Sequence, residues 1–337
     1  MRAFVIRGPG EAGVEEVDDP VAGPGEVVVA VARVGVCGTD VECFTGEMAY
    51  LAQGISRYPL RIGHEWCGTV VEVGAGVDPS WVGRWTTGDT MIGCGRCRRC
   101  LRGRSHVCAE RSELGLRGAW DGAAAERLRF PAASLHPLPD SIDDVAGALV
   151  EPGANALRAV WGADPRPGDR VLVIGAGSIG ILAAWFVLDR GAEVHVAGRS
   201  ERSIAFARSL GLPSVSATDA IPGPPWDAVI DASNDARVPV RALELVEPGG
   251  RVVCIGLAGV PSVIDTRDLA LAEVTAVGVL GGSAGLDDTI EAYASGRVDP
   301  RPLVGPLVGL DGLAAALAGD RPAGTGPGPK IHADPRR

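Results

Sequence analysis

One glycine-rich run constrains the fold of this chain more than any other feature. The apolar segment VLVI at 171–174 leads directly into GAGSIG, whose glycines are Gly175, Gly177 and Gly180. The first glycine permits a tight turn, the second lets a pyrophosphate approach the backbone, and the third lets a helix pack closely on the strand. The run therefore predicts a strand, a turn and a helix arranged to bind a dinucleotide.

The helix that starts in this run contributes to the phosphate site. The backbone amides of its first residues, Ser178 and Ile179, can donate to phosphate oxygens, and the helix dipole adds a partial positive charge. Strand-like and helix-like segments then alternate along the chain. This alternation predicts a doubly wound parallel sheet over residues 156–284.

The end of the second strand in this region bears on the choice of cofactor. A site for NAD has an acidic residue about 20 residues after the glycine run, where it binds the ribose 2′-hydroxyl. This chain has Gly198, Arg199 and Ser200 there, with Arg202 close by. An arginine and a hydroxyl can bind the 2′-phosphate that a carboxylate would repel. We therefore expect NADP(H) in preference to NAD(H); the alternative is that Arg199 is only a solvated side chain.

The rest of the chain divides into two further parts. Residues 1–155 contain short strand-like runs separated by glycine and proline, which are typical of a compact β-rich, barrel-like domain. Residues 285–337 contain a helix-like segment, DDTIEAYASG, and a strand-like ending, PKIHADP. We expect this tail to return to the first domain, which makes the chain an α/β protein of two domains.

Four cysteines form a second informative run. Cys94, Cys97, Cys100 and Cys108 lie within 94–108, at a spacing that lets four thiolates converge on one tetrahedral zinc ion. An iron–sulfur run would place the fourth cysteine three residues after the third and follow it with proline. Disulfides are disfavoured if the chain stays in a reducing compartment. We therefore predict a structural zinc site, closed to substrate because the protein supplies all four ligands.

The composition argues against several classes of partner. The formal net charge of −10 disfavours nucleic acid. The N-terminal segment lacks the apolar core of a signal peptide, and the longest apolar stretch, 171–188, is interrupted by three glycines, so we expect no membrane span and a cytoplasmic protein. Arginine outnumbers lysine 31 to 1, and the single lysine, Lys330, gives little support to Schiff-base chemistry.

A third group of residues indicates a reactive centre. Cys37 lies in VGVCGTD, His64 and Glu65 lie in IGHEWCGTV, and Glu151 lies in VEPGANAL. Each has an ordinary structural explanation when taken alone. Their order along the chain, together with the cysteine run and the glycine run, resembles the zinc-dependent medium-chain dehydrogenase/reductase superfamily over nearly the whole length. The two glutamates resemble those of its polyol and threonine dehydrogenase branch.

The resemblance implies a GroES-like catalytic domain joined to a Rossmann domain, with two zinc ions per chain. It implies that the catalytic zinc ligands are Cys37, His64, Glu65 and Glu151, and it leaves open which glutamate binds at each step. Thr39 matches a hydroxyl that relays the proton of the alcohol. The resemblance also implies a homodimer or a homotetramer.

The expected reaction interconverts a secondary alcohol (a polyol, sugar alcohol, aminocyclitol or amino alcohol) and its ketone by hydride transfer. Alternatives are a threonine 3-dehydrogenase-like enzyme, an NADPH-dependent ketone reductase, and a zinc-stabilised nucleotide-binding protein without activity. A zinc-free quinone reductase is disfavoured because the ligand set is present. The chain departs from the family pattern at Ala123, Ala124 and Arg127, so the substrate preference of any relative does not transfer directly.

Overall fold

The structure is a computed structural model that describes residues 1–223, 225–321, 326 and 328–337. It divides into two compact units, one formed by Met1–Glu151 together with Leu286–Arg337 and the other by Pro152–Gly285. The division after Glu151 lies inside helix α4 (Val150–Ala163), and so does the boundary at 155 that the sequence indicates. One helix therefore belongs to both units.

The unit Pro152–Gly285 is built on a six-stranded parallel sheet with the order β12–β11–β10–β13–β14–β15. This confirms the predicted doubly wound sheet. Its strands are β10 (Arg170–Ile174), β11 (Glu193–Gly198), β12 (Val215–Ala217), β13 (Trp226–Asp231), β14 (Val246–Cys254) and β15 (Thr275–Gly278). Its helices are α5 (Ser178–Asp189), α6 (Glu201–Ser209), α7 (Val238–Leu245) and α8 (Thr266–Leu271), in addition to most of α4.

The central strand of this unit, β10, is apolar because it is buried on both faces. Residues 171–174 of β10 are all buried, because a central parallel strand is covered on both faces and needs a continuous apolar run. Helix α5 packs on β10 and β11 and buries seven residues between Gly180 and Val187. The strand and the helix that flank the glycine run are thus fixed firmly on either side of it.

The other unit contains a seven-stranded sheet in the order β16–β17–β3–β4–β5–β9, with β8 also paired to β3. Its pairs are antiparallel except for β16 with β17. The strands of the unit, including the small pairs β1–β2 and β6–β7, are β1 (Arg2–Gly8), β2 (Glu11–Glu16), β3 (Glu26–Gly35), β4 (Glu65–Val73), β5 (Trp85–Gly88), β6 (Met91–Ile92), β7 (Ser112–Glu113), β8 (Arg127–Pro131), β9 (Leu135–Pro137), β16 (Val304–Val308) and β17 (Lys330–Ala333). Its helices, besides the start of α4, are α1 (Gly38–Thr45), α2 (Ala49–Ala52), α3 (Asp144–Gly147), α9 (Leu286–Ala294) and α10 (Leu313–Leu317).

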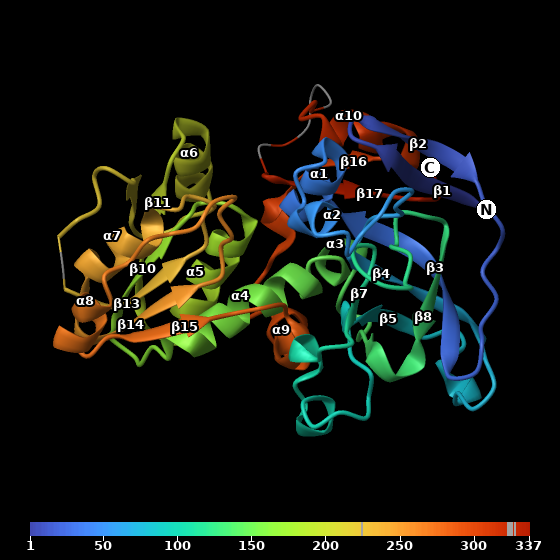
Figure 1. The fold of residues 1–337 in the computed structure, drawn as a ribbon, viewed down its shortest axis with the longest axis horizontal. Helices are drawn as coiled ribbons and strands as arrows, with labels where there is room; N and C mark the ends of the chain where they lie inside the picture. Colours follow the sequence, from blue (N-terminus) through green and yellow to red (C-terminus); the bar gives the residue numbers. More distant parts are fainter. Residues whose placement is uncertain (224, 322–325, 327) are drawn as a thin grey trace. The chain divides into compact units, whose positions relative to one another are not determined.

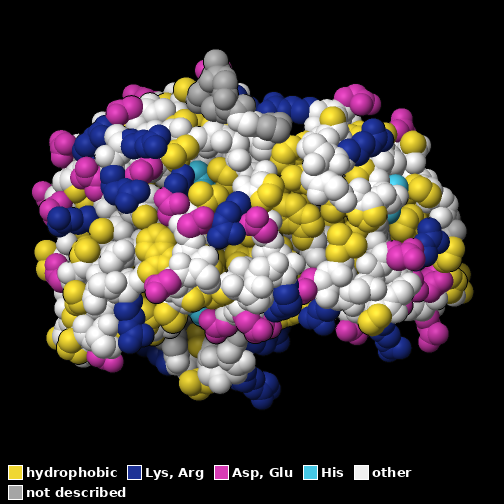
Figure 2. Space-filling model, turned by 180° about the vertical axis from the view of Figure 1, so that it is seen from behind, with side chains coloured by type: hydrophobic (Ala, Val, Ile, Leu, Met, Phe, Trp, Pro, Cys, Tyr) yellow, Lys and Arg dark blue, Asp and Glu magenta, His cyan; other side chains and the backbone are white. Residues whose placement is uncertain are grey.

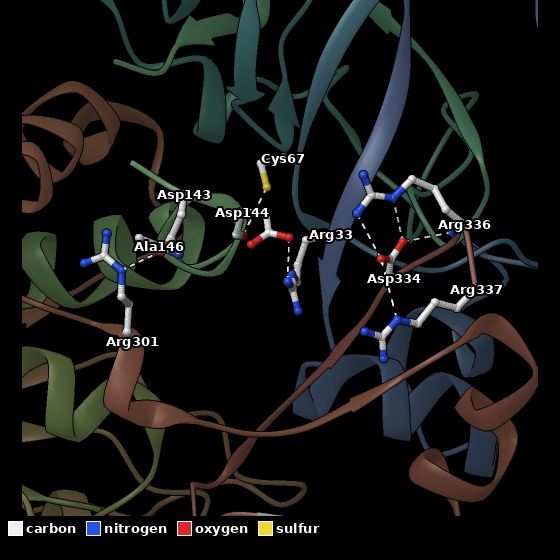
Figure 3. Close-up of polar contacts among 9 residues, drawn as sticks. All are labelled: Arg33, Cys67, Asp143, Asp144, Ala146, Arg301, Asp334, Arg336 and Arg337. Carbon is white, nitrogen blue, oxygen red and sulfur yellow. Dashed lines mark hydrogen bonds and ion pairs between the residues drawn. The ribbon is translucent and has the colours of Figure 1, made fainter. Parts of the chain in front are cut away.

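The C-terminal segment is an integral part of this unit. Strand β17 pairs with β3, and α10 lies beside α1 and β2, so segments from opposite ends of the chain are neighbours in Figure 1. A polar contact adds to this packing: Arg301 donates to Asp143, the N-cap of α3, at 2.8 Å (Figure 3). Within the segment itself, Asp334 accepts from Arg336 at 2.8 Å. The pairing of β17 with β3 brings the segment to the strand that leads to Cys37.

Acidic and basic side chains are interspersed over the face shown in Figure 2. Separately, none of the helices in the described parts of the chain is long and apolar enough to span a membrane.

Candidate active site

The ends of two neighbouring strands bring the predicted reactive residues together. Strand β3 ends at Gly35 and β4 begins at Glu65, and these two residues are partners in the β3–β4 pairing. Cys37 follows β3 as the N-cap of α1, and His64 immediately precedes β4. As a result, one donor atom each from Cys37, His64 and Glu65 lies within 4.8 Å of the other two.

A glycine makes room for this cluster. A Cβ atom placed on Gly35 would lie only 2.2 Å from Oε2 of Glu65 and would displace the carboxylate. His64 and Glu65 are buried, with exposed fractions of 7% and 1%, whereas Cys37 is partly exposed. A thiolate, an imidazole and a carboxylate suit zinc, and a set of three protein donors is typical of catalytic rather than structural zinc. The residues present therefore fit a reactive zinc ion.

Asp40 positions two of these ligands. One carboxylate oxygen accepts from the backbone N–H of Cys37 at 2.9 Å, and the other lies 3.4 Å from Nδ1 of His64. Burial opposes a charged imidazole, but the Asp40 carboxylate and the Cys37 sulfur raise the pKa of His64 well above its ordinary value. A carboxylate on one ring nitrogen fixes the ring and leaves the other nitrogen for a metal. Asp40 therefore acts on both the loop that carries Cys37 and the ring of His64.

Lys330 also belongs to the site, although no motif points to it. Its ammonium nitrogen lies 2.6 Å and 2.8 Å from the two carboxylate oxygens of Glu65 and donates to the backbone oxygen of Val36 at 3.2 Å. Burial opposes the charged ammonium, but the charges of Glu65 and Cys37 prevail and raise the pKa of Lys330. The only signal in the sequence is that this is the single lysine of the chain.

The remaining predicted residues of the reactive centre are less closely grouped. Thr39 Oγ1 lies 3.9 Å from the sulfur of Cys37. Glu151 is buried and its charge acts on Lys330, but it is outside the group of donors within 4.8 Å. The structure thus brings Glu65, and not Glu151, against Cys37 and His64.

The loop between Glu47 and Arg61 is tied to residues further along the chain. Tyr50 donates to Glu113 at 2.9 Å, and Arg61 pairs with Asp121 at 3.2 Å. Both side chains therefore already have partners within their own unit.

The four cysteines of the 94–108 run also converge. Their sulfurs form a group within 4.8 Å, and the separations for Cys94–Cys100, Cys97–Cys100 and Cys97–Cys108 are 4.0, 3.6 and 3.8 Å. Four sulfurs around zinc at about 2.3 Å would be about 3.8 Å apart, whereas a disulfide needs about 2.05 Å. Backbone N–H groups of Arg96 and Cys97 lower the pKa of Cys94 to about 6, which favours the thiolate. The geometry fits a tetrahedral zinc site.

The glycine run has the geometry expected of a phosphate site. Gly175 has a φ of 123°, and a Cβ on Gly180 would lie 1.7 Å from the oxygen of Gly175. Gly177 is the N-cap of α5, and a Cβ there would meet nothing within 4 Å. The open side of Gly177 and the amides of Ser178 and Ile179 therefore leave space and donors for a pyrophosphate.

The predicted residues for the ribose end follow β11. Gly198 is the last residue of the strand and is buried, whereas Arg199 and Arg202 are exposed. The hydroxyl of Ser200 caps α6 by accepting from the backbone of Ser203 at 3.2 Å. Two cations and a capping hydroxyl thus stand where an acidic residue would bind the ribose of NAD.

Two family models match this chain. The Alcohol dehydrogenase GroES-like domain matches residues 23–140, and the Zinc-binding dehydrogenase family matches residues 178–295. Similar proteins include L-threonine 3-dehydrogenase of Cutibacterium acnes, 34% identical over 83% of this chain and 84% of the relative. Another is L-galactonate-5-dehydrogenase of Escherichia coli, 32% identical over 76% of each chain.

Solved structures agree with these matches. A zinc-binding dehydrogenase of Sinorhizobium meliloti, bound to NADP, is 28% identical with a TM-score of 0.89, and an alcohol dehydrogenase of E. coli CFT073, in complex with NADH, is 25% identical with a TM-score of 0.90. Each comparison covers 99% of both chains. The fold and the site together define a zinc-type dehydrogenase that uses NAD(P). The chain belongs to the zinc-dependent medium-chain dehydrogenase/reductase superfamily and is an alcohol dehydrogenase that acts on a small molecule.

Proposed function

We propose that this enzyme oxidises a secondary alcohol that carries a neighbouring hydroxyl or amino group, with NADP as its preferred cofactor and with two zinc ions per chain. The substrate class comprises polyols, sugar alcohols, aminocyclitols and amino alcohols. The observation that carries the proposal is the cluster of Cys37, His64 and Glu65, which offers a thiolate, an imidazole and a carboxylate at one point. The relatives that act on threonine and on galactonate support the substrate class.

The residues of the cluster have distinct roles in this proposal. Cys37, His64 and Glu65 would hold zinc, which would supply a Lewis acid able to lower the pKa of an alcohol, as it lowers the pKa of bound water from 15.7 to about 7. Asp40 keeps His64 oriented. The hydroxyl of Thr39, beside Cys37, can both accept and donate a proton and so pass it from the alcohol toward solvent. Glu151 remains a second candidate carboxylate for the same centre. The four cysteines of the 94–108 run hold the other zinc and fold their loop.

An initial-rate panel tests the substrate and the reaction together. Polyols, inositols, amino alcohols including threonine, and simple secondary alcohols are each oxidised with NADP and with NAD, and the matching ketones are reduced. We expect turnover of a vicinal diol or amino alcohol, abolished by Cys37→Ser. Activity confined to simple alcohols contradicts the substrate class. No turnover in either direction would favour a binding protein without activity.

A second candidate, threonine 3-dehydrogenase, is favoured by the 34% identity to the Cutibacterium acnes enzyme. That assignment predicts threonine as the best substrate, with NAD as cofactor. Faster reduction of ketones with NADPH than oxidation of any alcohol would instead indicate a reductase.

The cofactor preference depends on Arg199 and can be tested separately. Arg199→Asp replaces the cation with a carboxylate that binds a ribose 2′-hydroxyl and repels a 2′-phosphate. We expect the ratio of kcat/KM for NADP to that for NAD to fall by roughly 100-fold, because a charge-assisted contact is replaced by repulsion. Arg237→Asp is the control, since Arg237 is exposed and paired with Asp235. An unchanged ratio in Arg199→Asp contradicts the proposed preference.

We further propose that two copies of the chain associate through strand β15. In the described part of the chain, β15 is the last strand of its sheet, and residues Thr275, Ala276 and Gly278 are exposed. Leu257, Val263 and Leu271, in the same unit, are more than 80% exposed. An open strand edge with apolar neighbours is a template for pairing with another chain.

A further inference from the structure

The position of the single lysine calls for an explanation. The chain has 31 arginines, yet the one site that keeps lysine is buried, with Lys330 5% exposed on β17. Its partner Glu65 is 1% exposed and comes from β4. A charged pair so far from solvent loses hydration and is retained only where its geometry is good.

The geometry accounts for the choice of lysine. An ammonium group has three N–H donors, and Lys330 has three acceptors: the two oxygens of Glu65 and the backbone oxygen of Val36. A guanidinium group is a larger planar fork with five donors, which would leave donors without acceptors in this buried space. The site therefore selects a compact cation, although the chain uses arginine everywhere else.

The same contacts link Lys330 to the metal ligands. Glu65 contacts the ammonium through both oxygens, yet one of its oxygens lies within 4.8 Å of the donors of Cys37 and His64. Val36, the third acceptor, immediately precedes Cys37. The carboxylate thus has two positive partners to choose between, the lysine and a bound ion.

We propose that Lys330 is a positioning residue of the catalytic metal centre, which holds Glu65 back and so keeps one coordination position open for substrate. This inference rests on the proposed function, since it assumes a metal at Cys37, His64 and Glu65. Without the ammonium, Glu65 would be a buried anion that has lost the cation contacting both of its oxygens, and a bound ion would attract it more strongly. It would then stay on the ion at all times and, together with Cys37, His64 and the second candidate carboxylate Glu151, would leave no coordination position for the alcohol.

This role predicts an unusual combination of effects for Lys330→Met. Cobalt(II) should bind more tightly, while kcat should fall, each by about 10-fold or more, the scale on which outer partners of metal ligands act. A residue that merely supports the fold would weaken metal binding and turnover together. The matched control is Arg336→Met, which removes a cation from the same segment, where it pairs with Asp334.

The experiment is a titration of chelator-treated protein with cobalt(II), followed by thiolate charge-transfer and d–d absorption and by isothermal calorimetry. The cysteines of the 94–108 run contribute equally in all variants, so difference spectra report on Cys37. Wild-type protein should show a signal that Cys37→Ser removes; its absence would overturn the proposed function itself. If the signal is present but Lys330→Met binds cobalt more weakly than wild type or equally tightly, the proposed role of Lys330 is wrong, while the proposed function stands.

A second variant covers the case in which Lys330→Met does not fold. In the Glu65→Gln background, the carboxylate charge that Lys330 restrains is absent. Replacing both members of a buried ion pair also destabilises the fold far less than removing one member. We expect Lys330→Met to change neither the cobalt spectrum nor the affinity in that background. If the double variant binds cobalt more weakly than Glu65→Gln alone, the lysine acts by a route other than Glu65 and the proposal is wrong.

Discussion

Asp40 shows how one buried carboxylate can serve two purposes. It accepts from the backbone of Cys37 through one oxygen and approaches His64 with the other. The first contact fixes the start of α1, and the second fixes the imidazole ring. Its loss should therefore affect metal binding more than folding.

We predict that Asp40→Asn lowers zinc affinity about 10- to 100-fold, because an amide holds the imidazole less strongly than a carboxylate. Competition with a chromophoric zinc chelator measures the affinity. Asp78→Asn is a suitable control, since Asp78 also accepts from a backbone N–H, that of Ser80, but lies outside the cluster. Equal affinity in both variants would mean that Asp40 acts only on the loop.

His332, two residues beyond Lys330, is fully buried at 0% exposure, and neither ring nitrogen has a hydrogen-bond partner among the described residues. Burial, together with the charges of Lys330 and Arg33, lowers the pKa of His332 well below its ordinary value. The unfolded chain therefore binds a proton below about pH 6.5 that the folded chain does not. The contribution of His332 to the free energy of unfolding is therefore fully present above that pH and is lost as the pH falls below it.

We predict that His332→Leu makes unfolding less sensitive to acid. Between pH 7 and pH 5 the free energy of unfolding of the wild type should fall more steeply, by up to about 1.4 kcal/mol per pH unit. Urea titrations at several pH values measure the slope. Ile331→Leu, at a neighbouring buried residue of β17 without an ionisable group, should retain the wild-type slope. If His332→Leu retains it too, His332 does not govern the response.

The sequence indicated candidate site residues where the spacing within a motif is short. Cys37, His64 and Glu65 lie in short motifs, and the structure places their donors together. Lys330 could not be predicted, because its contact with Glu65 spans 265 residues and no local pattern encodes it. The sequence left the choice between Glu65 and Glu151 open, since both are equally plausible ligands by residue type, and the structure adds only that Glu65 lies in the group of donors with Cys37 and His64.

At the level of elements, the cysteine loop has little secondary structure of its own. Between β6 and β7 the structure has only two short 3-10 helices, Cys100–Arg102 and Ser105–Val107. Apart from these helices, the conformation of the loop is set by turns and by the converging thiolates. A loop of this kind depends on its metal for a fixed conformation.

We predict that Cys108→Ser makes this loop sensitive to trypsin. The loop contains five exposed arginines, at positions 96, 98, 99, 102 and 104, and cleavage requires local opening of the backbone. Limited proteolysis followed by mass spectrometry should locate the first cuts there. Cys254→Ser, at a cysteine outside the loop, should be cut no faster than wild type. If Cys108→Ser resists trypsin as well as the wild type does, zinc is not needed to fold this loop.

The sequence predicted the elements of the parallel sheet better than those of the other unit. Strand β10 and helix α5 were evident because an apolar run, three glycines and a second apolar run follow one another. The short helices α1, α2 and α3 were not predicted, because each is too short for a clear helical period. The pairing of β17 with β3 was also invisible, since registers between distant segments are set by packing and not by local propensity.

At the scale of the whole molecule, the open edge of β15 governs the expected assembly. The amide of Val279 donates to β14 at Cys254, and in a parallel strand the donors of alternate residues face opposite ways. The amide of Ala276 therefore faces the open edge. That donor is available to a second copy of the chain.

We predict that Ala276→Pro yields a smaller assembly than wild type. Proline removes the outward donor but no bond to β14, and it is tolerated on edge strands at such positions. Light scattering coupled to size-exclusion chromatography measures the mass, and circular dichroism checks the fold. Ala220→Pro, in the turn after β12, is the control. An unchanged mass in Ala276→Pro would place the interface elsewhere or show that no interface forms.

The contact between Glu65 and Lys330 also has a consequence for biosynthesis. The ribosome makes Glu65 265 residues before it makes Lys330, so the buried carboxylate lacks its counterion during most of translation. The first domain can begin to collapse as it emerges, since domains generally fold in order from the N-terminus. Its metal centre, however, can reach its final charge balance only after β17 has been synthesised and has joined β3. An ion captured earlier would meet an unrestrained glutamate, and the nascent chain would hold that ion in a different, more closed coordination than the finished enzyme.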